Sequence, residues 1–509
     1  MPDAAITLKW LPHIQGLKRN NLYQIMKITD LQPKLLWECF DEITKVPRPT
    51  HHLDKMRKFL VDWAEKHNIP VKTDAVGNVV MTKPATPGHE NAPTIILQGH
   101  QDMVAEKRGD KEHDFLNDPI TTIVDGDWVK ADGTTLGADN GMGVASGMAV
   151  LLDDTLVHGP IECLFTVDEE QGLIGANGLQ AGFVTGSILL NLDSEDFGQI
   201  VIGCAGGKVT IATLPFTRIA APTDHAYYRV CVDHFKGGHS GMEIGLGRAN
   251  ANQQLARFLW EARKQFGLVL ADIDGGNLAN AIPRECHATV GIPADRKADF
   301  EKYAETFRDM LRAEFILAEG KDFVFEATPA EAPEQIILPE IADRLVAAIF
   351  SCPNGVQGMS NAVPGLIETS CNLASVKLIE GDKAVVTVHQ RSSVDSRRDE
   401  IADRVKALFE MIGAEVVFDD AYVGWAPNPE SKVLKVAEQS FEQLFGEKPR
   451  VEALHAGLEC GLFLEKMPGL DMISFGPTLK DIHSPSEKAN IPSVQKYWDF
   501  LCDILRRLA

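Results

Sequence analysis

The sequence predicts an α/β fold: a mixed, mostly parallel sheet flanked by helices, with an α+β domain inserted into it. Between about residue 92 and residue 193, short runs rich in β-branched and apolar residues alternate with helical patterns. The runs are TIIL at 94–97, IECLFTV at 161–167 and SILLNL at 187–192. Strands that alternate with helices in this way are typical of a parallel sheet covered by helices.

The pattern changes in the middle of the chain and changes back near its end. Strand-like runs such as YYRVCVDHF and AVVTVHQRSSV are separated there by long amphipathic helices at 251–266 and 401–411. Later, the strand-like run DMISFGP at 471–477 and a helical pattern at 491–508 indicate a return to the first layer. A second domain inserted into the first accounts for this order.

The positions of these changes predict the domain boundaries. We predict a first domain formed by residues 1–207 and 424–509, and an inserted domain formed by residues 208–423. Within the inserted domain, EATPAEAPE at 326–334 is predicted to be a surface linker.

Composition and charge exclude several classes of function. Among the 509 residues there is no apolar run of about 18 or more, so we expect neither a transmembrane helix nor a membrane partner. The N-terminus lacks the compact apolar stretch of a signal peptide, which favours the cytoplasm. A net charge of −22 opposes binding to nucleic acid. The nine cysteines are scattered and never form a C-x-x-C pair, so we expect reduced cysteines that pack in the interior.

Polar residues follow the predicted strands at their carboxyl ends, which is where ligand sites of open α/β sheets lie. The first run is followed by GHQD at 99–102, the second by DEE at 168–170, and the third by DSED at 193–196. Imidazoles and carboxylates are ligands that zinc accepts, and this set suits a site for two metal ions. The candidate metal ligands are His100, Asp139, Glu170, Asp193 and His483.

Chemistry suggests separate roles for three of the acidic residues. Asp139 lies in a glycine-flanked turn before a small-residue helix, which makes it the natural carboxylate to bridge two metals. Asp102 follows His100 by two positions and can accept the second N–H of the imidazole, which would fix the ring. Because neighbouring side chains point in different directions, Glu170 can bind metal while Glu169 faces the attacking water as a general base.

Each of these clusters has an alternative interpretation when it stands alone. A single Gly-His or Asp-Glu-Glu segment is typical of a solvated loop, with no chemical function. The ordered combination of all of them on an α/β pattern is what indicates a metal site.

Eight segments resemble the signatures of the aminoacyl-histidine dipeptidase family. They are GHQDMV, LGADNGMGVA, TVDEEQGLIGA, LNLDSED, KGGHSGMEIG, GGNLANAIPRE, HAGLECG and DIHSPSE. This family belongs to a larger di-zinc group that includes peptidase T, peptidase V, aminoacylases and succinyl-diaminopimelate desuccinylase. The resemblance runs from about Leu31 to the C-terminus, and the roughly 30 residues before it are expected to be an extra tail or the product of an upstream start codon.

The resemblance implies two zinc ions per chain, with manganese or cobalt as substitutes. One ion would be held by His100 and Asp193 and the other by Glu170 and His483, with Asp139 bridging them. The implied reaction is hydrolysis of dipeptides, including Xaa-His dipeptides such as β-alanyl-histidine. A homodimer formed through the inserted domain is a further implication.

The resemblance also assigns a role to the inserted domain, as a lid over the metals. His239 would stabilise the oxyanion of the scissile carbonyl, while Asn280 and Arg391 would hold the terminal carboxylate of the substrate. Alternative interpretations of these three residues are an ordered glycine turn, a turn cap and a surface ion pair. The roles of His455 and Glu459 in HAGLECG stay open between a tight turn and a contact that supports the metal ligands.

Two other functions compete with a dipeptidase. An N-acyl amino acid deacylase or desuccinylase would use the same metals with a different acyl pocket. A dipeptidase must accommodate a free α-ammonium, so an acidic residue such as Glu195 near the metals favours it. The second competing function is that of a non-catalytic binding module. The presence of Glu169 together with all five candidate ligands argues against it.

Overall fold

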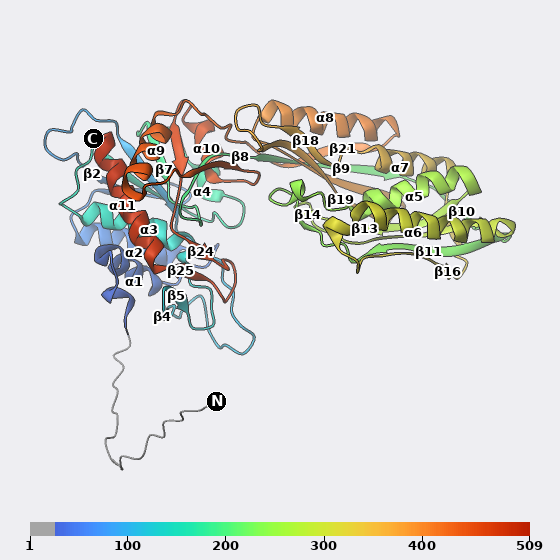
Figure 1. The fold of residues 1–509 in the computed structure, drawn as a ribbon, viewed down its shortest axis with the longest axis horizontal. Helices are drawn as coiled ribbons and strands as arrows, with labels where there is room; N and C mark the ends of the chain where they lie inside the picture. Colours follow the sequence, from blue (N-terminus) through green and yellow to red (C-terminus); the bar gives the residue numbers. More distant parts are fainter. Residues whose placement is uncertain (1–25) are drawn as a thin grey trace, which may run out of the picture.

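The computed structural model describes residues 26–509, except for the side chain of Asp420. The molecule is elongated, with two bodies side by side (Figure 1). The first domain contains both the first and the last elements of the chain, and the inserted domain contains the elements between residues 206 and 422. The predicted fold class is confirmed.

The first domain is built on an eight-stranded mixed sheet with the order β1-β2-β6-β3-β7-β23-β8-β22. The pairs β6–β3, β3–β7, β7–β23 and β8–β22 are parallel, and the others are antiparallel. The strands are β1 (Val71–Thr73), β2 (Val79–Lys83), β3 (Ile95–His100), β6 (Ile161–Thr166), β7 (Ile188–Asn191), β8 (Gln199–Cys204), β22 (Arg450–Leu454) and β23 (Asp471–Ser474).

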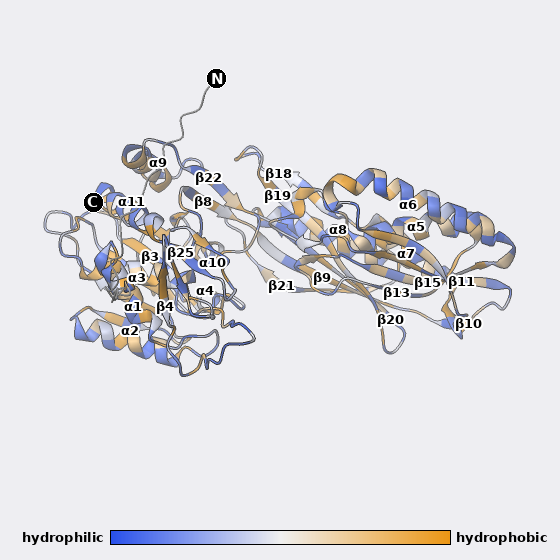
Figure 2. Cartoon of the chain, turned by 60° about the horizontal axis from the view of Figure 1, so that its bottom comes forward, coloured by the Kyte–Doolittle hydropathy of each residue, from blue (hydrophilic) through white to orange (hydrophobic). Residues whose placement is uncertain are grey.

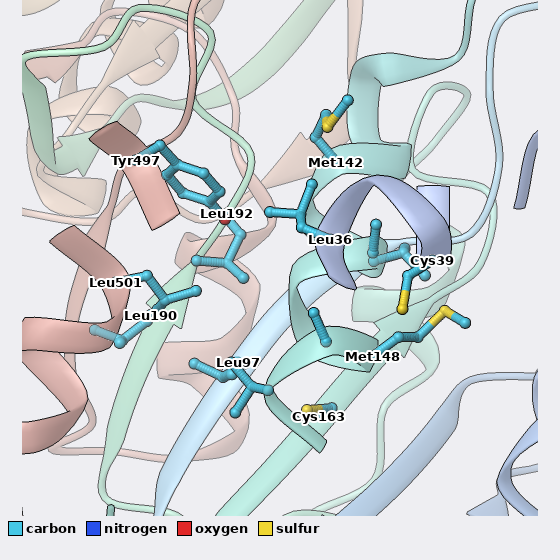
Figure 3. Packing of buried hydrophobic residues seen from close by; sticks show 14 of the residues in the cluster. Leu36, Cys39, Leu97, Met142, Met148, Cys163, Leu190, Leu192, Tyr497 and Leu501 are labelled. Atoms are coloured by element: carbon cyan, nitrogen blue, oxygen red, sulfur yellow. The ribbon is translucent and has the colours of Figure 1, made fainter. Parts of the chain in front are cut away.

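Helices cover both faces of this sheet. One face packs on α1 (Lys34–Thr44), α2 (Asp54–Lys66), α3 (Ala138–Leu152), α9 (Lys432–Phe445) and α11 (Ile491–Leu508). The other face packs on α4 (Ile174–Gly178) and α10 (Glu459–Lys466). Since successive side chains of a strand point to opposite faces, Leu97 joins the first core and Ile96 joins the second. Figure 3 shows Leu97 and Cys163 from the sheet packing near Met148 and Leu501 from two of the helices.

A small four-stranded sheet extends the first domain. Its order is β24-β25-β5-β4, which places the chain just after β23 beside the chain just before α3. The strands are β4 (Thr122–Asp125), β5 (Trp128–Ala131), β24 (Leu479–Lys480) and β25 (Lys488–Asn490). The loop between β24 and β25 carries His483, so this pairing holds that histidine near the start of α3.

The inserted domain is built on a nine-stranded antiparallel sheet with the main order β16-β11-β15-β13-β19-β20-β9-β21, and β18 pairs with β19 beside it. Its helices lie along one side of the sheet in Figure 1, and Figure 2 shows hydrophobic and hydrophilic stretches alternating along α6. The strands are β9 (Gly206–Pro215), β11 (His225–Asp233), β13 (Val269–Gly275), β15 (Cys286–Pro293), β16 (Val324–Ala330), β18 (Gly355–Met359), β19 (Ile367–Ile379), β20 (Lys383–Ser392) and β21 (Glu415–Tyr422). The helices are α5 (Ala251–Phe266), α6 (Lys297–Glu319), α7 (Pro339–Ser351) and α8 (Asp395–Met411).

Two short strand pairs complete the inserted domain. The pair β12 (Gly238–His239) and β14 (Ala281–Ile282) brings His239 close to the loop that carries Asn280. The pair β10 (Arg218–Ala220) and β17 (Gln335–Ile337) joins distant parts of the chain. The remaining short elements are the 3-10 helices η1 (Ile28–Asp30), η2 (Ile244–Leu246) and η3 (Ala294–Arg296).

One expectation about a connecting segment was wrong in part. Most of the predicted linker at 326–334 belongs to the edge strand β16, where proline is tolerated because one side of the strand makes no ladder hydrogen bonds. Residues 1–25 of the predicted tail lie outside the described residues. The Ile28 side chain is only 1% exposed and packs in the first core, so the chain belongs to the first domain from this residue on.

The chain crosses between the two bodies twice, at one junction. Cys204 and Trp425 exchange two backbone hydrogen bonds of 2.9 Å there, which ties the outgoing strand to the returning one.

All nine cysteines are free thiols, and seven of them are buried. Within residues 26–509, no helix combines the length and the apolar character needed to cross a bilayer.

Candidate metal centre and substrate cavity

Three neighbouring parallel strands bring four of the predicted site residues to one edge of the sheet. His100 is the last residue of β3, Glu169 and Glu170 follow β6, and Asp193 follows β7. Since β6, β3 and β7 are adjacent and parallel, their carboxyl ends meet. Asp139 enters from the start of α3, where the backbone departs from helical geometry.

The five candidate metal ligands converge in two groups that share Asp139. His100 Nε2 lies 3.2 Å from Asp139 Oδ1 and 3.4 Å from Asp193 Oδ1. On the other side, His483 Nε2 lies 3.2 Å from Asp139 Oδ2 and 2.9 Å from Glu170 Oε2. Each oxygen of Asp139 therefore faces a different imidazole, as a carboxylate that bridges two ions requires.

The chemistry of these side chains fits metal ions. Asp193 Oδ1 and Glu170 Oε1 are buried and have no hydrogen-bond partner within residues 26–509. Burial raises the pKa of Asp193 to about 7, and hydrogen bonds to Asp139 and Glu170 raise the pKa of His483 to about 11. The raised pKa of Asp193 reflects the cost of burying its charge, and the raised pKa of His483 reflects the carboxylates around it. A divalent cation would offset both effects.

Asp102 contacts three of the predicted site residues. Its carboxylate lies 3.3 Å from His100 Nδ1, and accepts hydrogen bonds from the Glu169 N–H at 3.1 Å, the Glu170 N–H at 3.3 Å and the Thr50 hydroxyl at 3.0 Å. Burial acts to raise the pKa of Asp102. The hydrogen bond and the charge of His100, followed by the hydrogen bonds from the Glu169 N–H and the Thr50 hydroxyl, outweigh this effect and keep the pKa low. An ionised Asp102 thus fixes both the ring of His100 and the backbone that carries the two glutamates.

Two further residues that the sequence did not single out build the loop of Asp139. The Glu487 carboxylate accepts backbone hydrogen bonds from four consecutive residues, at 2.7 Å from Leu136, 2.9 Å from Gly137, 2.7 Å from Ala138 and 3.2 Å from Asp139. The signal was present, because Glu487 is the last residue of the DIHSPSE segment that supplies His483. One segment thus provides a candidate ligand and also fixes the backbone of another candidate ligand.

Arg48 is the second of these residues. Its buried guanidinium donates hydrogen bonds to the carbonyl oxygens of Gln101 at 3.0 Å and Asp102 at 2.7 Å, and also to the carbonyl of Gly137. The loops of His100 and Asp139 are thereby joined through one side chain from a distant part of the chain. No local sequence pattern marks such a residue.

Replacing Glu487 with glutamine is expected to lower the free energy of unfolding by about 2–3 kcal/mol, because hydrogen bonds to a buried charged group are among the stronger ones. Metal content should fall as well, since the Asp139 loop loses its support. Chemical unfolding and metal analysis of the purified protein measure the two effects. The control is Glu430→Gln, an exposed carboxylate in a surface ion pair, which should change stability by less than about 0.5 kcal/mol. Equal stability of the two variants would contradict the role of Glu487.

A cavity of about 700 Å³ opens beside the metal-ligand cluster, between the two bodies. From the first domain it is lined by Glu169, Glu170 and His483 among others, and from the inserted domain by residues that include His239, Asn280, His389, Arg391 and Tyr422. The structure therefore places the predicted lid residues and the metal side in one space.

Glu169 faces this cavity and is not among the five ligands. Burial raises its pKa well above the usual value, and neighbouring carboxylates act in the same direction. A carboxylate with a raised pKa in a cavity is a stronger base than an exposed one, as proton transfer from water requires.

His239 is arranged as a hydrogen-bond donor. Its Nδ1 accepts hydrogen bonds from the N–H groups of Met242 at 3.0 Å and Gly241 at 3.3 Å. Burial, followed by the charge of Arg391, lowers the pKa of His239, so the ring is neutral. A neutral ring whose Nδ1 accepts must carry its proton on Nε2. The turn interpretation of His239 is therefore compatible with the functional one, since the turn fixes the tautomer.

Arg391 is a buried cation that has no anionic partner in the described part of the chain. Its side chain is only 5% exposed, and its Nε has no hydrogen-bond partner within residues 26–509. No described carboxylate forms an ion pair with it. Burial and the charge of Arg391 lower the pKa of both His389 and His455 to about 3. Buried charges are normally paired, so this surrounding of neutral rings indicates a place for an anion.

His455 and Glu459 have different places. His455 comes from the first domain, and its Nε2 lies 2.7 Å from the hydroxyl of Ser370 on β19, so it connects the two bodies. Glu459 is buried behind the metal ligands, where its carboxylate accepts hydrogen bonds from Gln98 at 2.6 Å and Thr166 at 2.8 Å. Both residues support the site from outside the ligand set.

Comparison with known proteins agrees with the fold. Residues 96–507 match the peptidase family M20/M25/M40, and the chain belongs to this family. It is 39% identical to the cytosol non-specific dipeptidase of Escherichia coli (strain K12), over 95% of this chain and 99% of that protein. The predicted resemblance is thereby confirmed.

Solved structures give the same result. An aminoacylhistidine dipeptidase from Vibrio alginolyticus superposes with a TM-score of 0.90 and is 42% identical, with 95% of this chain and 98% of that chain covered. The aminopeptidase PepT from Bacillus cereus ATCC 10987 superposes with a TM-score of 0.56 at 17% identity, over 94% of this chain and 99% of that chain. The second likeness shows the shared fold alone.

Proposed function

We propose that this chain is a dinuclear zinc dipeptidase that hydrolyses a range of dipeptides, including Xaa-His dipeptides such as β-alanyl-histidine. The observation that carries the proposal is one cavity that joins a cluster of metal-ligand type to a buried arginine, which forms no ion pair with any described carboxylate. The first side suits activation of water and of a peptide carbonyl, and the second suits a free carboxylate. The dipeptidase names of the E. coli and V. alginolyticus relatives support this choice.

Within the site, His100 and Asp193 would hold one ion, Glu170 and His483 the other, and Asp139 both. When bound, the ions lower the pKa of the attacking water and polarise the scissile carbonyl. The metal ions would thus supply chemistry that protein side chains lack.

The side chains of the chain perform the remaining steps. Arg391 and Asn280 bind the carboxylate of the dipeptide and so place its peptide bond between the two bodies. Glu169 accepts the proton of the attacking water and returns it to the departing amine. His239 donates its Nε2–H to the oxyanion that forms. The requirement for a carboxylate near the scissile bond restricts substrates to short peptides with a free C-terminus.

Location and assembly follow as parts of the same proposal. A cytoplasmic location is supported by the name of the E. coli relative. A homodimer through the inserted domain stays a prediction.

The proposal is tested with metal-stripped protein on β-alanyl-histidine, leucyl-glycine and N-succinyl-diaminopimelate, each with and without added zinc, manganese or cobalt. We expect both dipeptides to be cleaved only after metal is added. Turnover of the succinyl substrate with inactivity on both dipeptides would instead identify a desuccinylase of the same family. Inactivity on all three substrates with metal bound would favour a binding module.

A further inference from the structure

Three neighbouring strands of the inserted domain place Arg391 and Tyr422 on either side of a glycine. In the order β20-β9-β21, Arg391 pairs with Gly207, and Gly207 pairs with Tyr422. Residues that are directly opposite across strands project from the same face of a sheet. Because adjacent strands are about 4.8 Å apart, the outer two backbones are roughly 10 Å apart, and the missing side chain at Gly207 leaves the space between them open.

The two side chains meet across this space. An Arg391 Nη1–H donates a hydrogen bond of 2.7 Å to the Tyr422 hydroxyl oxygen. A Cβ atom at Gly207 would lie 2.5 Å from the Tyr422 ring, so the contact requires glycine at that position. A Cβ atom at Gly457, in the first domain, would lie 3.0 Å from the opposite edge of the same ring. The ring is therefore held between the inserted domain and the first domain, at the point where the chain returns.

We propose that Tyr422 is a positioning residue that orients Arg391 toward the carboxylate of the substrate. This inference rests on the proposed function, in which Arg391 binds that carboxylate. With Nη1 held by the tyrosine, the edge of the guanidinium formed by Nε and Nη2 is left for the ligand, and Nε is the buried atom that has no partner. This edge makes paired hydrogen bonds to a carboxylate.

The orientation matters because a long side chain must otherwise be ordered when the substrate binds. Arg391 has several rotatable bonds, and fixing such a side chain costs conformational entropy. A tyrosine that holds it beforehand removes part of that cost and selects the geometry of paired hydrogen bonds. Tyr422 therefore acts on substrates that carry a free carboxylate and has no effect on the chemical step.

The test compares leucyl-glycine with leucyl-glycinamide, which lacks the carboxylate, in wild-type protein and in Tyr422→Phe, with metal bound. We expect kcat/KM for leucyl-glycine to fall about tenfold in Tyr422→Phe, mainly through a higher KM, as loss of a hydrogen bond to a charged group predicts. For leucyl-glycinamide, kcat/KM should stay within about twofold of wild type. The control Tyr227→Phe removes another lid hydroxyl, which donates to the Pro222 carbonyl away from the cavity, and should resemble wild type on both substrates.

A second variant, Arg391→Met, tests the carboxylate site separately from the role of Tyr422. If this variant loses the preference for leucyl-glycine while Tyr422→Phe keeps it unchanged, the carboxylate site stands and the role of Tyr422 is wrong. An equal fall on both substrates in Tyr422→Phe also overturns that role, because it indicates a general structural defect. If Arg391→Met keeps the wild-type preference, the carboxylate site itself is wrong, and the inference about Tyr422 fails with it.

Discussion

Replacing Glu169 with glutamine is expected to lower kcat for leucyl-glycine by about 10³-fold, within the range attributed to a positioned general base. The amide has nearly the shape of the carboxylate but cannot accept the proton of the attacking water. The Glu169 N–H remains on Asp102, so the loop that carries Glu170 should keep its geometry. Steady-state kinetics and metal analysis of the same preparation should show lost turnover with unchanged metal content.

The matched control is Glu459→Gln, since Glu459 is also a buried carboxylate near His100. Its hydrogen bonds run to Gln98 and Thr166, behind the ligands, and it does not line the cavity. We expect this variant to lose some stability but less than about tenfold in kcat. Similar losses of kcat in the two variants would show that the fall in Glu169→Gln reflects disturbed charge in the cluster, and the general-base role would have to be given up.

The elements that the sequence predicted best are those whose signals are local. The helix predicted at 251–266 is α5 with the same bounds, because Asn250 caps its first turn, with its side chain accepting from Gln253 N–H at 3.1 Å, and Gly267 ends it in a left-handed conformation. The strand-end rule predicted for a similar reason that His100, Glu169 and Asp193 lie together at one edge of the sheet, as they do. Each one follows a short apolar run, and parallel strands bring such ends together.

What sequence reasoning missed depends on contacts between distant segments. Glu487 and the backbone that it holds are about 350 residues apart in the chain, and Arg48 reaches Gly137 from 89 residues away. Neither residue type signals its target, because any buried carboxylate or guanidinium could make such bonds. The contact between Arg391 and Tyr422 is of the same kind. It depends on the register of three strands and on a glycine in the middle one, which no local pattern reveals.

The edge strand β16 shows a different limit. It contains Glu326, Ala327, Pro329 and Ala330, residue types that are rare in central strands and typical of linkers. These residues are tolerated on the edge of a sheet. Proline lacks the N–H that pairing with a further strand would use, and the charge of Glu326 opposes pairing with other molecules. Composition alone does not distinguish a protected edge from a loop.

Asp139→Asn is the second substitution with a large expected effect, and it acts on the metals themselves. The two carboxylate oxygens of Asp139 face His100 and His483 separately, so an amide would offer only one oxygen and no charge where two ions must share a ligand. We expect metal content to fall from two ions per chain to one or fewer after dialysis. We expect kcat to fall by about 10³-fold, equivalent to the several kcal/mol that metal ions supply to such reactions.

A surface aspartate provides the control for this substitution. Asp132 pairs with Lys111 at 2.7 Å and is half exposed, so Asp132→Asn should keep both metal content and activity. If Asp139→Asn retained two ions and wild-type kcat, the shared position of Asp139 would have no functional meaning, and the two groups of ligands would have to be regarded as independent sites. Loss of one ion with full activity would instead show that a single ion suffices. In either case Glu487, which holds the backbone of Asp139 through four hydrogen bonds, would support the fold but not the reaction, and Glu487→Gln should then lower stability without lowering kcat.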